Sequence, residues 1–192
     1  MRLWLIRHAR PQVDSGVCYG RLDLPADAAA TSQAAHALAD ALPAGLAVIT
    51  SPLQRCRQLA DALLARRPDL GARSDARLAE MDFGAWEGRA WDAIPRAELD
   101  AWTGQFAQYR AGGTGESVHQ FMERVAAALE EARSGAQDRA WITHAGVIKA
   151  VGLLNQGRAG RELEARDWPA QGLAWGQWQP LQVAPQTPPR RR

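Results

Sequence analysis

Short apolar runs alternate along this chain with longer stretches in which apolar residues recur at helical spacing. The runs at 3–6, 46–50 and 140–143 are too short for helices and predict buried strands. Residues 73–78 predict a weaker strand, and 173–183 predict a final strand pair. Helices are predicted at 32–42, 52–64, 91–110 with a break near Pro95, 117–129 and 147–154. This alternation favours a three-layer α/β/α fold with a mainly parallel sheet.

Three of the predicted helices have recognisable start signals. Thr31 or Ser32 can cap the first helix. Ser51 followed by Pro52 predicts a serine cap with proline at the first helical position of the second. At the start of the fourth helix, Ser117 and Gln120 have the spacing of a capping box.

Composition places the chain among globular proteins and narrows its partners. The apolar share is 46% and the charged share 23%, and no apolar stretch is long enough to cross a bilayer, so we expect a cytoplasmic protein. A single domain is predicted over 1–183, followed by a tail at 184–192 with too little apolar content to fold. The net charge is +2, but the last three residues are arginines, so the rest of the chain has a net charge of 2 − 3 = −1. This charge argues against a basic surface for nucleic acid.

The two cysteines do not suggest a disulfide framework or a metal site. Cys18 and Cys56 are far apart in the sequence, and neither has metal-ligand spacing to another ligand residue. Without a secretory segment they are expected to be free thiols.

Polar residues stand where strands end and where a helix begins. Arg7 and His8 follow the first predicted strand, and His144 follows the strand at 140–143. Arg55 lies in the first turn of the helix after the second strand, and Glu80 opens a loop rich in aromatic, acidic and glycine residues. Ligands of parallel sheets bind beyond the carboxyl ends of the strands, so one crevice can gather all five residues. Taken singly, each is as well explained by a solvated or packed side chain.

Five short segments carry a family resemblance in their order along the chain. They are Leu5-Ile6-Arg7-His8, Ser51-Pro52-Leu53-Gln54-Arg55-Cys56, residues 78–88, Gly115-Glu116-Ser117 and Thr143-His144-Ala145-Gly146-Val147-Ile148. Together they resemble the histidine phosphatase superfamily, which has the phosphoglycerate mutase-like fold.

The resemblance implies a role for each of the gathered residues. His8 would be the nucleophile that becomes phosphohistidine, Arg7, Arg55 and His144 would bind the phosphate, and Glu80 would be the proton donor. The chemistry suits these residue types, because arginine stays charged and a histidine with a pKa of about 6.5 is available in its attacking neutral form. Positioning and charge stabilisation dominate phosphoryl transfer, so neither a metal nor a cofactor is expected.

The opening motif departs from the usual Arg-His-Gly-Glu of the family. Here it is Arg-His-Ala-Arg, so Arg10 adds a cation near the mouth of the pocket. Asp14 or Ser15 is a candidate for the polar residue that commonly follows in the family.

The short chain favours a phosphatase over a mutase, because the mutases that it resembles are generally longer. The loop at 16–23 is similar to that of the α-ribazole phosphatase type, which acts on a 5′-phosphate in cobalamin assembly. There Tyr19 and Trp86 are candidates to stack on a base and Arg21 to contact a polar group.

Two alternatives remain open from the sequence. One is a broad-specificity phosphatase of sugar phosphates or nucleotides. The other is a catalytically silent member that binds phosphorylated partners, although the presence of Glu80 argues against it because binding alone requires no proton donor. In each case we expect a small phosphorylated metabolite as partner, with neither nucleic acid nor membrane, while the oligomeric state stays open.

Overall fold

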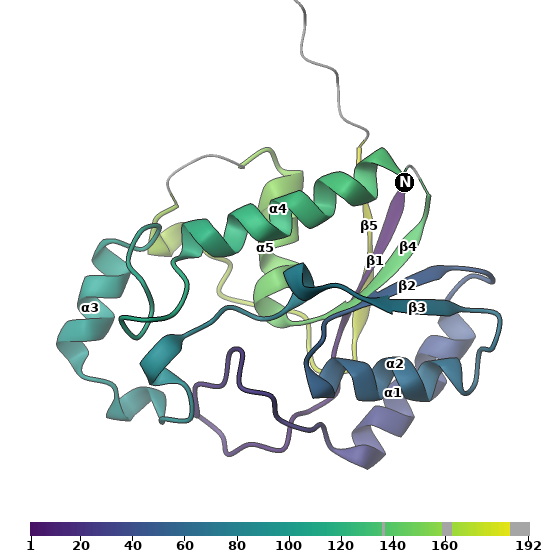
Figure 1. Ribbon diagram of the computed structural model, residues 1–192, viewed down its shortest axis with the longest axis horizontal. Helices are drawn as coiled ribbons and strands as arrows, with labels where there is room; N and C mark the ends of the chain where they lie inside the picture. Colours follow the sequence, from purple (N-terminus) through teal and green to yellow (C-terminus); the bar gives the residue numbers. More distant parts are fainter. Residues whose placement is uncertain (136, 159–162, 185–192) are drawn as a thin grey trace, which may run out of the picture.

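A five-stranded, mainly parallel sheet forms the centre of the computed structural model, which describes residues 1–135, 137–158 and 163–184 (Figure 1). The strand order is β3-β2-β4-β1-β5, and only β5 runs antiparallel to its neighbour. The strands are β1 (Arg2–Arg7), β2 (Ala47–Thr50), β3 (Gly71–Ser74), β4 (Arg139–Thr143) and β5 (Trp178–Gln182). The predicted fold class is confirmed.

Helices cover both faces of the sheet because successive strand residues point to opposite sides. Ile6 packs with the helices α1 (Ala28–Ala41) and α2 (Gln54–Leu64) on one face. Its neighbour Leu5 packs on the other face with α4 (Val118–Ser134) and α5 (Ala145–Asn155). Figure 1 shows these two pairs on either side of the sheet, with α3 (Arg96–Gly104) set apart from it. Within the described ranges, no helix has the length and apolar character needed to span a membrane.

The predicted final strand pair is wrong. Among residues 163–184 the structure has one strand, β5, and the residues before it run across the end of β1 instead. The N–H of Gly176 donates to the carbonyl of His8, and the N–H of Arg7 donates to the carbonyl of Gln177. The backbone of this segment is therefore hydrogen-bonded to the end of β1, where the polar residues lie, and does not form a hairpin.

The weak strand predicted at 73–78 is only partly correct. β3 ends at Ser74, and a 3₁₀ turn follows at Ala76–Leu78. The Asp75 carboxylate accepts a hydrogen bond from the backbone N–H of Arg77 at 2.9 Å. This N–H therefore has a local partner and does not pair with a neighbouring strand.

Two predicted helix starts also differ from the structure. Asp27, not Thr31 or Ser32, caps α1, and the hydroxyl of Thr31 donates to the Asp27 carbonyl from inside the helix. α2 begins at Gln54 with no side-chain cap; the Ser51 hydroxyl accepts a hydrogen bond from the N–H of Leu53, ahead of the helix, and also contacts a histidine elsewhere in the fold.

Two other predicted features are confirmed, although the helix predicted to reach residue 110 ends at Gly104. The capping box of Ser117 and Gln120 is formed at the start of α4, and the break at Pro95 separates a 3₁₀ turn at Trp91–Ala93 from α3. The tail predicted at 184–192 lies, apart from Ala184, outside the described residues.

Candidate active site

The ends of β1 and β4 bring two histidines together at the carboxyl edge of the sheet. These strands are parallel neighbours with Arg7 opposite Thr143, so the residue after each strand emerges at the same level. The ring centroids of His8 and His144 lie 5.1 Å apart, and both side chains are buried. The predicted pairing of the two strand-end histidines is confirmed.

His8 is held in one neutral form by its own loop. Its Nδ1 lies 2.6 Å from the carbonyl oxygen of Ala9. A carbonyl can only accept, so Nδ1 carries the proton and Nε2 keeps a free lone pair. Burial, and after it the charge of Arg55, lowers the pKa of His8 to about 3; the hydrogen bond to the Ala9 carbonyl opposes this shift, and the charge of Arg7 adds a smaller lowering contribution. The imidazole is therefore neutral and nucleophilic at physiological pH.

Two arginines flank His8 without a carboxylate to neutralise them. Arg55 is fully buried, and its Nη1 and Nη2 donate to the carbonyls of Leu22 at 2.8 Å and Gly20 at 2.7 Å. Arg7 donates through Nη1 to the carbonyl of Leu173 at 2.7 Å. Each guanidinium also has a buried Nε with no partner among the described residues, and neither forms an ion pair within them. Buried charges require counter-charges, so this pocket is built to receive an anion.

An aromatic ring lies against each of the two guanidinium groups. The Cζ of Arg7 lies 5.2 Å from the ring centroid of Trp175, and that of Arg55 lies 5.3 Å from the ring centroid of Tyr19. Such contacts limit the orientations of a guanidinium while leaving its charge uncompensated.

His144 is positioned by residues that follow β2. Its Nε2 lies 2.8 Å from the Ser51 hydroxyl and 3.5 Å from the Cys56 sulfur. Burial, followed by the charge of Arg55, holds the pKa of His144 well below its ordinary value, so this ring is also neutral. Burial raises the pKa of the Cys56 thiol to about 12, which leaves it protonated. The sequence predicted Ser51 only as a helix cap; its place directly after a strand is the signal for a site role.

Glu80 is held by its own loop and by the start of α5. Its carboxylate accepts hydrogen bonds from the N–H groups of Met81 and Gly146, each at 3.0 Å. A Cβ at Gly146 would collide with the Glu80 carboxylate, so only glycine allows this approach two residues beyond His144. Glu80 therefore lies beside the histidine pair, as the sequence predicted for one crevice.

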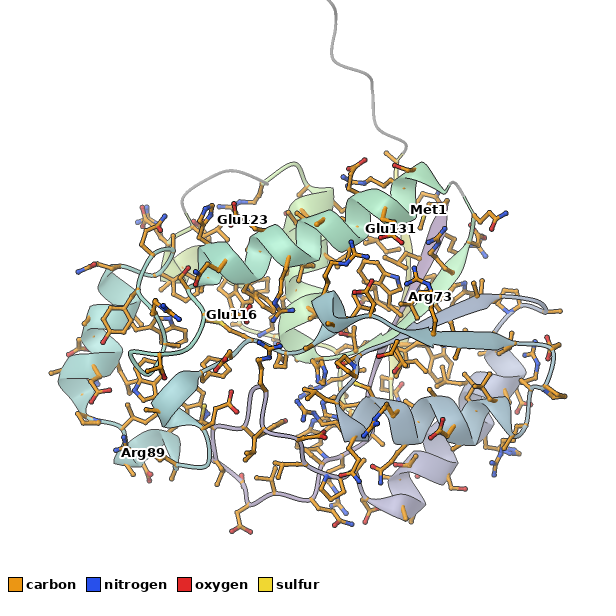
Figure 2. All side chains as sticks on the ribbon, viewed as in Figure 1. Met1, Arg73, Arg89, Glu116, Glu123 and Glu131 are labelled. Carbon is orange, nitrogen blue, oxygen red and sulfur yellow. The ribbon has the colours of Figure 1, made fainter. Side chains whose placement is uncertain are left out.

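Arg124 is a positioning residue that the sequence patterns did not reveal. Its guanidinium donates to the carbonyls of Ala79 at 2.7 Å and Glu80 at 2.9 Å, and pairs with the Glu116 carboxylate at 2.7 Å. Glu116 stands at the start of α4 (Figure 2) and also accepts from the N–H of Asp82. The available signal was an arginine beside the apolar face of the predicted helix at 117–129.

The predicted substrate contacts have different surroundings. Arg10 and Arg21 are on the surface, with weak ion pairs to Asp27 at 3.8 Å and Asp82 at 3.9 Å. Trp86 cannot stack on a ligand base, because it is fully buried and its Nε1 donates to Glu98 at 2.6 Å. The stacking role predicted for Trp86 is therefore corrected: it belongs to the aromatic core.

The described residues contain no group of three or more His, Cys, Asp or Glu side chains that could hold a metal ion. The chemistry available at this edge of the sheet consists of a neutral imidazole with a free lone pair, an anion pocket and an adjacent carboxyl group.

Known proteins resemble the chain over most of its length. "Putative phosphoserine phosphatase 2" of Hydrogenobacter thermophilus is 30% identical over 81% of this chain and 79% of its own. "Probable phosphoglycerate mutase GpmB" of Escherichia coli is 30% identical over 69% of this chain, which spans 63% of that relative. The crystal structure of the alpha-ribazole phosphatase from Shigella flexneri superposes with a TM-score of 0.79 at 26% identity, covering 96% of this chain and 91% of that one.

A family model covers nearly the whole described fold. Residues 3–179 match the model of the histidine phosphatase superfamily, branch 1. The match includes both strand-end histidines, both pocket arginines and Glu80. The chain belongs to the histidine phosphatase superfamily (branch 1) and is an enzyme of that superfamily.

Proposed function

We propose that this enzyme is a metal-independent phosphomonoesterase that works through a phosphohistidine formed on His8, and that its substrate is α-ribazole 5′-phosphate. One observation carries the reaction: a neutral imidazole with a free Nε2 lies near the fully buried guanidinium of Arg55 and the half-buried guanidinium of Arg7, neither of which has a described carboxylate partner. An anionic phosphate ester supplies the charge that this pocket lacks.

In the first step, the ester binds with its phosphate oxygens on Arg7, Arg55 and His144. Nε2 of His8 attacks phosphorus, and the bond between phosphorus and the leaving oxygen breaks. Protonated Glu80 transfers its proton to that oxygen, so the product leaves as a neutral alcohol. The transition state is loose, and the two guanidinium groups stabilise its charge without moving.

In the second step, water attacks the phosphorus of the phosphohistidine. The Glu80 carboxylate takes a proton from this water, the bond between nitrogen and phosphorus breaks, and inorganic phosphate is released. His8 returns to its neutral form and Glu80 to its protonated form, so the cycle closes with one water consumed. The hydrogen bonds from Met81 and Gly146 fix the direction in which Glu80 acts.

The choice of α-ribazole 5′-phosphate is supported by the similarity to the Shigella flexneri enzyme over almost the full length of both chains. The loop at 16–23 also enters the site, because its carbonyls at Gly20 and Leu22 hold Arg55. The second candidate is a phosphatase of broader specificity. It is favoured by the names of the other relatives, which refer to phosphoserine and phosphoglycerate.

The test measures phosphate release, with EDTA present, from α-ribazole 5′-phosphate, nucleoside monophosphates, sugar phosphates, phosphoglycerates and an aryl phosphate. We expect His8→Ala to lower the rate by about 10³-fold or more on every ester, because no other group can form the covalent intermediate. Exposed His36 provides the matched control, and His36→Ala should retain the wild-type rate. Quenching in alkali should trap an acid-labile phosphoenzyme on the wild type only.

The outcomes separate the parts of the proposal. Preference for α-ribazole 5′-phosphate supports both the mechanism and the substrate. Similar low rates on all esters would support the phosphatase reaction but reject α-ribazole 5′-phosphate as the substrate. Turnover by a folded His8→Ala variant would reject the nucleophile.

A further inference from the structure

A cavity of 180 Å³ lies directly beside Glu80. Glu80 and Gly146, which belong to the candidate active site, form part of its lining. The rest is mainly aromatic and comes from segments far apart in the sequence: Phe83, Trp102, Phe106, Phe121 and Trp168. The cavity is partly open to the surface, so a ligand can enter it beside the carboxyl group that the proposed mechanism uses.

The size and walls of the cavity suit a flat ring. An engineered apolar cavity of about 150 Å³ in another protein stays dry and binds benzene. Several walls are themselves held by ring contacts: the Phe106 and Trp168 centroids are 6.0 Å apart, and those of Phe121 and Trp168 are 6.3 Å apart. A second ring system placed among them gains the same edge and face contacts.

Two polar groups at the cavity have no described partner. The indole Nε1 of Trp102 is buried without a hydrogen bond among the described residues. Buried N–H groups in native proteins are almost always paired, so this N–H is available to donate to an acceptor on a ligand. Lys149, the only lysine of the sequence, also lines the cavity and forms no described ion pair.

The direction of the reaction places the leaving group at this cavity. The nucleophile and the leaving oxygen lie on opposite sides of phosphorus in an in-line displacement. Because Glu80 protonates that oxygen, the alcohol must lie on the Glu80 side of the phosphate. The aromatic residues predicted from the sequence do not compete for this role, since Tyr19 covers Arg55 and Trp86 is buried.

We propose that the cavity lined by Phe83, Trp102, Phe106, Phe121 and Trp168 binds the leaving alcohol and selects one that carries a flat aromatic ring with a hydrogen-bond acceptor at its edge. This inference rests on the proposed function, because it takes Glu80 as the proton donor. It makes a ring-bearing alcohol the substrate class and assigns Trp102 as the donor to the ring.

The kinetic test uses three esters with the same leaving oxygen: α-ribazole 5′-phosphate, adenosine 5′-phosphate and ribose 5-phosphate. The wild type should prefer a ring-bearing ester over ribose 5-phosphate in kcat/KM. Filling the cavity with Val118→Phe should lower this preference by about tenfold or more, as expected when a pocket loses the space for a ring. Trp102→Phe keeps an aromatic side chain but removes the indole N–H, and should lower the preference for the ring-bearing ester by about fivefold.

The matched control is Trp91→Phe. Trp91 stacks on Trp102 with centroids 6.3 Å apart but does not line the cavity, so its replacement should leave the preference within about twofold of the wild type. Thermal unfolding of each variant reports whether it folds. If Val118→Phe does not fold, the comparison of Trp102→Phe with Trp91→Phe decides the question.

A binding test separates this inference from the proposed reaction. Titration of benzimidazole, which carries no phosphate, should give the same affinity for the wild type and for His8→Ala, and about tenfold weaker affinity for Val118→Phe. Unchanged affinity and an unchanged preference in Val118→Phe and Trp102→Phe would overturn the cavity assignment even if the enzyme is an active phosphatase. Benzimidazole binding in the cavity with no His8-dependent turnover would retain the ring site and reject the reaction.

Discussion

The charged pocket and the aromatic cavity both adjoin Glu80 and are built in different ways. Arg7, His8 and His144 stand at the ends of neighbouring strands, and backbone carbonyls hold the pocket arginines in place. The cavity is assembled from side chains of the loop after Glu80, α3, α4 and the segment around Trp168. The comparison teaches that, in the proposed mechanism, residues at the edge of the sheet carry out the chemistry, whereas elements outside the sheet form the cavity that would select the substrate.

Removing the charge of the pocket should separate the two regions most clearly. We expect Arg55→Ala to lower kcat/KM by about 10³-fold on every phosphate ester, because it removes a buried cation aimed at the transferring group. Benzimidazole affinity should stay at the wild-type value. The control is Arg57→Ala, an exposed arginine on the same helix, and it should keep full activity. Loss of benzimidazole binding together with activity would mean that the two regions are not independent.

Glu80 stands between the regions, so its replacement should have an effect that depends on the leaving group. Glu80→Gln should slow alkyl phosphates by about 10²-fold, because their alkoxides need a proton, and slow an aryl phosphate by less than about tenfold. Steady-state kinetics on both esters measure the difference. Glu123→Gln, on the exposed side of α4 (Figure 2), is the control. Equal losses on both esters would contradict the proton-donor role.

Acid should destabilise the protein through the pocket. The pKa of His8 is about 3 in the folded protein and about 6.5 in the unfolded chain. Below pH 6.5, His8 is therefore protonated in the unfolded chain while it stays neutral in the folded protein. The free energy of unfolding should therefore fall as the pH drops from 6.5 toward 3. By pH 4.5 the contribution of His8 is about 3 kcal/mol. His144 acts in the same direction.

Urea unfolding at pH 7.0 and pH 4.5 measures this effect as a difference between variants. His8→Gln should lose less stability on acidification than the wild type, and His36→Gln, at an exposed position, should behave like the wild type. Identical acid sensitivity in His8→Gln and the wild type would show that His8 is not held neutral by the fold.

Local patterns in the sequence were sufficient wherever one segment carries the whole signal. The apolar runs at 3–6, 46–50 and 140–143 predicted three strands, and the parallel arrangement brought Arg7, His8 and His144 to one edge as expected. They failed where an apparently local signal has a distant partner. Ser51 has the spacing of a helix cap, yet its hydroxyl binds a histidine 93 residues away.

The aromatic residues illustrate the same limit. Trp86 and Trp102 look alike in the sequence, but one is fully buried with its N–H bound to Glu98, while the other lines a cavity and its N–H has no partner among the described residues. Which of the two is available to a ligand depends on how α3 and α4 pack against the loop after Glu80.

The sequence by itself determined the alternating strands and helices, the family and the residues of the charged pocket, because these depend on periodicity and on the residue types directly after each strand. Only the tertiary structure decided the contact of Ser51 with His144, the hydrogen bond from Arg124 to the backbone carbonyl of Glu80 and the ring-sized cavity. The physical reason is range: periodicity acts over a few residues, whereas these contacts join side chains 44 to 93 positions apart, whose meeting is set by packing of the whole fold.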